Sequence, residues 1–166
     1  MVILVSDTSV LIDLERGALL ERVFSCGLTM AVPDLLYEKE LASYNGPYLQ
    51  KLGLGVTVLS PTELGLAQTI KNERSALSLS DCFALSCSLR PNHALLTGDR
   101  NLRAEAEMRN AQVYGLLWLL DQLEASGQIP ASALHDGLSK IAAHERCRLP
   151  KDEVKTRLDR WAARSG

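Results

Sequence analysis

The chain has 166 residues, 46% of them hydrophobic, and a formal net charge of −2. This length and composition suit one folded domain, with at most a small appendage, and they exclude a disordered chain. No apolar run approaches the ~20 residues that cross a bilayer, and no signal peptide is visible. We therefore expect a cytoplasmic protein with no membrane partner.

Charge is unevenly distributed along the chain. The last 27 residues, from Lys140 onward, hold eight Lys/Arg and four Asp/Glu, whereas the preceding 139 residues hold ten and sixteen. An acidic body is not typical of a general nucleic-acid-binding protein, but it suits a site that gathers carboxylates around a cation. The basic C-terminal segment either offsets the repulsion of phosphates or is a solvated helix surface.

A short apolar run, Val2–Val5, predicts a first strand that is buried on both faces of a parallel sheet. The polar residues that follow, Ser6–Ser9, favour a turn and a helix cap. Asp7 therefore lies at the carboxyl end of the first strand, which is the edge where open α/β sheets bind ligands. Asp7 is also a good helix N-cap, so its position alone leaves both roles open.

The rest of the chain alternates apolar runs with helical patterns. Further strands are predicted at residues 28–32, 56–59, 94–97 and 112–114. Helices are predicted at residues 10–24 with a break at Gly17, then at 34–42, 61–72, 75–89, 102–108, 116–120, 131–146 and 151–163, and Asn45–Pro47 is predicted to be a loop. This alternation predicts an α/β fold with a mostly parallel central sheet, covered on both faces, plus C-terminal helices. No P-loop or dinucleotide-binding motif occurs.

Acidic residues from separate predicted elements could meet at one edge of this sheet. Asp7 and Asp99 each follow a strand directly, Asp81 lies in the first turn of a helix, and Glu38 and Glu40 lie near the start of another. Each has a simpler explanation as a cap, a first-turn residue or a solvated charge. If they converge, they would bind Mg²⁺ or Mn²⁺ and support hydrolysis of a phosphodiester.

Four segments resemble the acidic motifs of PIN (PilT N-terminus) domains, and they are Ser6–Ser9, Val32–Glu38, Ser80–Leu85 and Leu95–Leu102. The resemblance covers about residues 2–120. It implies a three-layer α/β/α sandwich with a central parallel sheet, and Mg²⁺- or Mn²⁺-dependent cleavage of RNA. Many bacterial members are VapC-like toxins that are neutralised by a small antitoxin protein.

The resemblance also implies roles for single residues. Acids that match the family's metal-binding and catalytic positions are Asp7, Glu38, Asp81 and Asp99. Glu40 is the alternative to Glu38, because the two lie about 200° apart on an α-helix and only one can face the metal. Hydroxyl residues that would orient a carboxylate or a water are Thr8, Ser9 and Thr97. Candidates for contacts with the RNA backbone are Arg100 and Arg103.

We predict a PIN-like nuclease domain over residues 1–124 and a C-terminal helical extension over residues 125–166. The predicted function is a metal-dependent endoribonuclease that is the toxin of a toxin–antitoxin pair. The alternative is a non-catalytic RNA-binding or assembly module with the same fold. A haloacid dehalogenase-type phosphatase fits less well, because Ser9 stands where that chemistry needs a second acid. Leu116–Leu120 and the C-terminal helices either form a homodimer surface or only cover the sheet.

Overall fold

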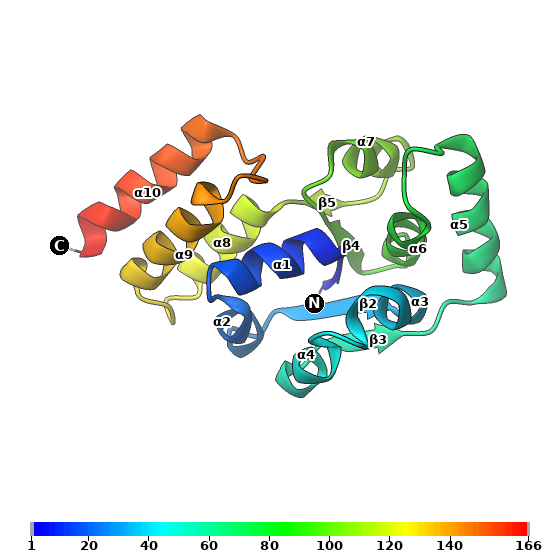
Figure 1. Ribbon diagram of the computed structural model, residues 1–166, viewed down its shortest axis with the longest axis horizontal. Coiled ribbons are helices and arrows are strands. Elements are labelled where there is room, and N and C mark those ends of the chain that lie inside the picture. Colours follow the sequence, from blue (N-terminus) through cyan, green and yellow to red (C-terminus); the bar gives the residue numbers. More distant parts are fainter. Residues whose placement is uncertain (1, 166) are drawn as a thin grey trace.

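A five-stranded parallel sheet forms the centre of the molecule in the computed structural model, which describes residues 2–165 (Figure 1). The strand order is β3-β2-β1-β4-β5, and every neighbouring pair is parallel. The strands are β1 (Ile3–Ser6), β2 (Thr29–Pro33), β3 (Gly55–Thr57), β4 (His93–Leu96) and β5 (Val113–Tyr114). The core strands β1, β2 and β4 are almost fully buried, as their apolar sequences predict.

Helices flank this sheet and give the predicted three-layer α/β/α sandwich. Those before β5 are α1 (Thr8–Arg16), α2 (Leu20–Ser25), α3 (Asp34–Leu36), the π-helix η1 (Tyr37–Leu41), α4 (Gly46–Leu52), α5 (Pro61–Glu73), α6 (Leu79–Ser88) and α7 (Arg100–Met108). Those after β5 are α8 (Leu116–Ala125), α9 (Ala131–Ala143) and α10 (Lys151–Ser165). In Figure 1, α8, α9 and α10 gather at one end of the molecule and α5 lies at the other. Within residues 2–165, no helix is both long and apolar enough to cross a membrane.

Several of the predicted segments differ from the structure in their bounds, and three of them are instructive. Asn45–Pro47 was predicted as a loop, but α4 begins at Gly46, with Pro47 in its first turn, where the missing N–H of proline does no harm. Burial of Leu49 fixes this helix on the core. The helix predicted over residues 75–89 begins only after its cap, Ser78, and the one predicted over 131–146 ends at Ala143, so residues 144–150 form a loop.

The strand order changes direction at β1. The chain leaves β1 for β2 and β3 on one side and then returns to β4 on the other side. In an open parallel sheet this switch point opens a crevice at the carboxyl ends of the two strands. Ser6 pairs with Leu96, and the Asp7 N–H donates to the Leu96 carbonyl oxygen at 3.0 Å. The residues that follow β1 and β4 are therefore held side by side.

The leucines of α8 belong to the core of this chain. Leu116, Leu117, Leu119 and Leu120 are at most 7% exposed, and Trp118 stacks on Tyr114 with ring centroids 3.9 Å apart. The idea that residues 116–120 offer a homodimer surface is therefore wrong, since these leucines are already buried within this chain. The homodimer itself stays a prediction.

Helix α9 packs closely against the end of α1. A Cβ atom at Gly137 of α9 would lie 2.6 Å from Leu19 Cδ1 and 2.9 Å from the carbonyl oxygen of Gly17. Only glycine allows the two backbones to approach this closely without a shift. This contact joins the segment after residue 124 to the helix that follows β1, while the predicted division at residues 124 and 125 stays a prediction.

Replacing Gly137 tests this contact. Gly137→Ala should lower the free energy of unfolding by about 1–2 kcal/mol, because overpacking outweighs the better helix propensity of alanine. Gly65→Ala is the matched control, since nothing lies within 4 Å of a Cβ there and Gly65 is exposed in α5. The control should raise the free energy of unfolding by about 0.5–1 kcal/mol. Urea denaturation measures both, and equal stabilisation by both alanines would contradict the close packing.

Candidate active site at the carboxyl edge of the sheet

Asp7 is only 3% exposed, and its carboxylate is held by three donors. Oδ1 accepts from the Val10 N–H at 3.0 Å and from Ser9 Oγ at 2.9 Å, and Oδ2 accepts from Thr97 Oγ1. Burial raises the pKa of Asp7 from its ordinary 3.8 to about 6, even though these hydrogen bonds favour the charged form. Asp7 is thus an N-cap of α1 and also an acid placed where ionisation is unfavourable.

The hydroxyl of Thr97 links the ends of β1 and β4. It donates to Asp7 Oδ2 and accepts from the Asp99 N–H at 3.0 Å, and Thr97 is fully buried. Asp99 caps α7 by accepting from the Leu102 N–H at 2.9 Å. Asp7 and Asp99 therefore occupy equivalent strand-to-helix turns, and the Thr97 hydroxyl bonds the side chain of Asp7 and the backbone of Asp99.

Asp81 is the electrostatic centre of the acids. It forms a capping box with Ser78, in which the Asp81 N–H donates to Ser78 Oγ at 3.0 Å and the Ser78 N–H donates to Asp81 Oδ2 at 3.2 Å. Burial raises the pKa of Asp81, and the negative charges of Asp99 and Glu40 raise it further. The charge of Asp81 in turn adds to the raised pKa of Asp7. The carboxylates of Asp7, Glu40, Asp81 and Asp99, which we call the acid cluster, therefore interact with one another.

Glu40, rather than Glu38, lies beside the other acids. Thr8 Oγ1 donates to Glu40 Oε2 at 2.9 Å, whereas Glu38 is exposed and makes no hydrogen bond or ion pair with any residue in 2–165. The geometry therefore does not support the preference for Glu38. Glu40 is exposed, as Glu38 is, but it lies four residues after the buried Leu36, on the helix face from which it reaches Thr8.

A π-helical turn also shapes this segment. The Ala42 N–H donates to the Tyr37 carbonyl oxygen, five residues back, at 2.8 Å. Such turns occur often at functional sites, and nothing in the sequence pattern announces this one. The π-turn, like the contact between Glu40 and Thr8, 32 residues apart, could not have been found from local sequence.

The acid cluster has no basic partner. None of its four members forms an ion pair with Lys or Arg among the described residues, whereas acids elsewhere in the chain do, including Glu63, Glu105, Asp121 and Glu124. Unneutralised carboxylate oxygens are the ligands that hard divalent cations prefer. The chemistry of this donor set therefore fits Mg²⁺ or Mn²⁺.

The present side-chain positions do not assemble a complete metal site. Within residues 2–165, no group of three or more Asp, Glu, His or Cys side chains is arranged to hold an ion. Each carboxylate is instead turned toward local donors, namely helix N–H groups and the hydroxyls of Thr8, Ser9 and Thr97. The assignment of the acid cluster as metal ligands stays a prediction.

The two predicted RNA-contacting arginines lie in different surroundings. Arg100 lines a cleft of about 840 Å³, which also includes Ser9 and Asp99. Arg103 does not line this cleft, and its guanidinium lies 3.8 Å from Glu107. The cleft also contains Arg16, which no sequence motif marks.

The raised pKa of Asp7 predicts a pH-dependent stability. The folded state binds the Asp7 proton more tightly than the unfolded chain, so the free energy of unfolding falls as pH rises from 3.8 through about 6. Above pH 6, a pKa shift of this size lowers the free energy of unfolding by roughly 3 kcal/mol relative to its value below pH 3.8. Asp7→Asn cannot ionise and should be more stable than wild type by about 1–3 kcal/mol at neutral pH, with the gain vanishing near pH 4. Urea unfolding across this range measures it, and a pH-independent difference would contradict the burial effect.

Comparison with known proteins identifies the family. A model of the PIN domain family matches residues 3–163, which is nearly the whole chain and includes the acid cluster and helices α8 to α10. No curated protein and no solved structure matches the chain. PIN domains are in general nucleases that bind nucleic acids and typically use divalent metal ions. Because the match extends over almost the entire sequence, the chain belongs to the PIN domain family.

Proposed function

We propose that the protein is a divalent-metal-dependent endoribonuclease, which hydrolyses phosphodiester bonds in RNA. The observation that carries this proposal is the acid cluster: four carboxylates interact at the switch point of a parallel sheet and have no basic partner in the described chain. Family membership supports the nuclease class, and the resemblance of the acidic motifs supports RNA as the substrate.

In this proposal, Asp7, Glu40, Asp81 and Asp99 hold one or two Mg²⁺ or Mn²⁺ ions. A bound cation of this kind activates water and neutralises charge at the scissile phosphate. The neighbouring residues prepare the carboxylates for that role. Thr97 fixes Asp7 relative to Asp99, Ser9 fixes the second oxygen of Asp7, and Thr8 holds Glu40 toward the cluster.

We also propose the biological role of a toxin that a small antitoxin protein neutralises, with a cytoplasmic location. This role rests on the similarity of the acidic motifs to those of VapC-like toxins. Its first test is growth arrest of a bacterial host on expression of the wild-type chain. Growth arrest should be absent for a variant that lacks nuclease activity.

Cleavage assays test the nuclease proposal. Wild type should cleave single-stranded RNA with Mg²⁺ or Mn²⁺ and lose activity in EDTA. Asp99→Asn keeps a good cap for α7 but removes one charge from the acid cluster, so cleavage should fall by about 100-fold or more. Glu40→Gln should reduce cleavage strongly.

Glu38→Gln is the matched control for Glu40→Gln, because the same chemical change is made two residues away, at an equally exposed side chain that does not bond Thr8. It should leave cleavage close to wild type. RNA binding without any cleavage by wild type would instead favour the alternative, a non-catalytic RNA-binding or assembly module. Equal cleavage by wild type in EDTA and in Mn²⁺ would refute the metal dependence.

A further inference from the structure

Four arginines surround the cleft beside the acid cluster. The cleft lies between α1, the first turn of α7 and the α9–α10 loop (residues 144–150), and it includes Ser9 and Asp99. Its arginines are Arg16, Arg100, Arg146 and Arg148. We call this the arginine cleft. Its volume of about 840 Å³ lies in the range of sites that enclose a bound ligand.

Most of these guanidinium groups have no partner within the chain. Arg100, Arg146 and Arg148 are exposed and form no ion pair with any residue in 2–165, whereas Arg16 lies 3.4 Å from Asp13. The arginines of α10 differ, because Arg157, Arg160 and Arg164 are bonded to Asp121 and Glu124 of α8. The basic C-terminal segment therefore has two parts: α10 uses its arginines for packing, and the loop leaves its arginines available to an external anion.

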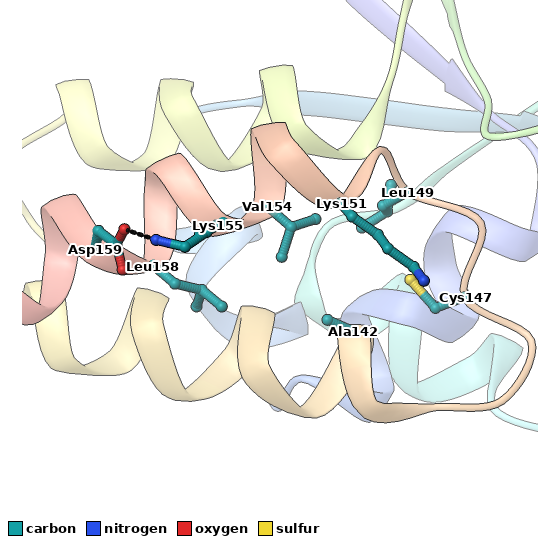
Figure 2. Close-up of a pocket in the computed structure, with 8 residues that line it drawn as sticks. All are labelled: Ala142, Cys147, Leu149, Lys151, Val154, Lys155, Leu158 and Asp159. Atoms are coloured by element: carbon teal, nitrogen blue, oxygen red, sulfur yellow. Dashed lines mark hydrogen bonds and ion pairs between the residues drawn. The ribbon is translucent and has the colours of Figure 1, made fainter.

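The α9–α10 loop alternates between anchoring and exposed residues. Cys147 and Leu149 are half-buried and line a second cavity of about 240 Å³ between α9 and α10, together with Ala142 and Val154 (Figure 2). Arg146 and Arg148 are exposed and line the arginine cleft, which Leu149 also borders from its other side. The apolar residues thus fix the loop, and the arginines between them face the cleft.

Both ends of the loop are attached to the body of the protein. At one end, Gly137 of α9 lies against Gly17 and Leu19. At the other, the fully buried Trp161 of α10 donates to Glu124 Oε2 at 2.8 Å, and Arg157 bonds both oxygens of Asp121 at 2.9 and 2.7 Å. Packing therefore sets the position of Arg146 and Arg148 relative to the acid cluster.

We propose that the arginine cleft binds the sugar–phosphate backbone of the RNA strand on one side of the scissile bond, with the α9–α10 loop as a substrate-positioning arm. This inference rests on the proposed function and adds the path of the substrate. Guanidinium groups suit it, because they bind phosphate oxygens through paired hydrogen bonds. Positive charge is needed here, because the acid cluster by itself repels phosphates. Exposed apolar surface of Ile12 in the same cleft can contact a ribose or a base.

Two double variants of equal charge change test the cleft. The test variant is Arg146→Gln with Arg148→Gln, and the control is Lys151→Gln with Lys155→Gln. The lysines come from the same basic segment, but they line the other cavity, and Lys155 bonds Asp159 at 2.7 Å (Figure 2). Binding of a short fluorescein-labelled single-stranded RNA is followed by anisotropy in the Asp99→Asn background, between ~50 and ~200 mM salt.

The arginine variant should weaken binding about tenfold or more and lower the slope of log affinity against log salt by up to ~1.4, which is ~0.7 for each lost phosphate contact. The lysine variant should change the slope far less. Arg146→Lys with Arg148→Lys keeps the charge and should restore most of the slope. Equal slopes for the arginine and lysine variants would overturn the proposal, because only overall charge would then matter.

Kinetics separate this inference from the proposed function. In the active background, the arginine variant should raise KM for RNA and leave kcat nearly unchanged, whereas Asp99→Asn should lower kcat. RNA cleavage by wild type together with an unchanged KM and salt slope in the arginine variant would overturn the cleft and leave the nuclease proposal standing. A salt slope that depends on the arginines, together with no cleavage under any metal condition, would overturn the nuclease proposal and leave the cleft standing as an RNA-binding surface.

Discussion

The hydroxyl of Thr97 joins the ends of the two strands on which the candidate site depends. Because β1 and β4 are neighbours at the switch point, Asp7 and Asp99 emerge side by side, and Thr97 Oγ1 donates to the Asp7 carboxylate and accepts from the backbone N–H of Asp99. The hydrogen bonds that fix Asp7 do not offset the loss of water around it, so its pKa is raised to about 6. The fold thus keeps an unfavourable charge in a defined place, which is typical of a functional site rather than of a structural cap.

Several acids outside the acid cluster are paired with arginine. Glu105 is paired with Arg74 and Arg109, and Asp121 and Glu124 are paired with arginines of α10. The acid cluster and the arginines of the α9–α10 loop are left unpaired within the described residues, and both lie at the same edge of the sheet. Unpaired arginines suit the phosphates of a substrate. Unpaired carboxylates suit a cation that bridges them to those phosphates.

Sequence patterns predicted the strands and helix caps, because these depend on residues that are close together in the chain. The apolar runs predicted the strands, and the polar residues after them predicted the caps Asp7 and Asp99. Ser78 and Asp81 were likewise recognisable, because a capping box is formed by residues three apart. The position of the acids at one edge followed from the parallel order of strands, which alternating strands and helices predict.

Features that depend on tertiary contacts were not predictable in this way. The start of α4 depends on the burial of Leu49, and the burial of Leu116–Leu120 depends on what α8 covers. The basic C-terminal segment looked uniform in sequence, and only the pairing of α10 with Asp121 and Glu124, about 36 residues earlier, separates Arg157 from Arg146. The choice between Glu38 and Glu40 depends on a tertiary contact, the hydrogen bond from Thr8 to Glu40, and it stays a prediction.

The central claim is that the acid cluster binds a divalent cation. The most direct measurement is calorimetric titration of wild type and Asp81→Asn with Mn²⁺, since asparagine at this position can still accept from the Ser78 N–H and so preserve the capping box. We expect saturable binding to wild type and at least tenfold weaker binding to Asp81→Asn, because the charge that interacts with the other three acids is lost. Asp152→Asn, exposed on the remote α10, should bind as wild type does. Equal Mn²⁺ affinity for wild type and Asp81→Asn, or no saturable binding to wild type, would contradict the claim.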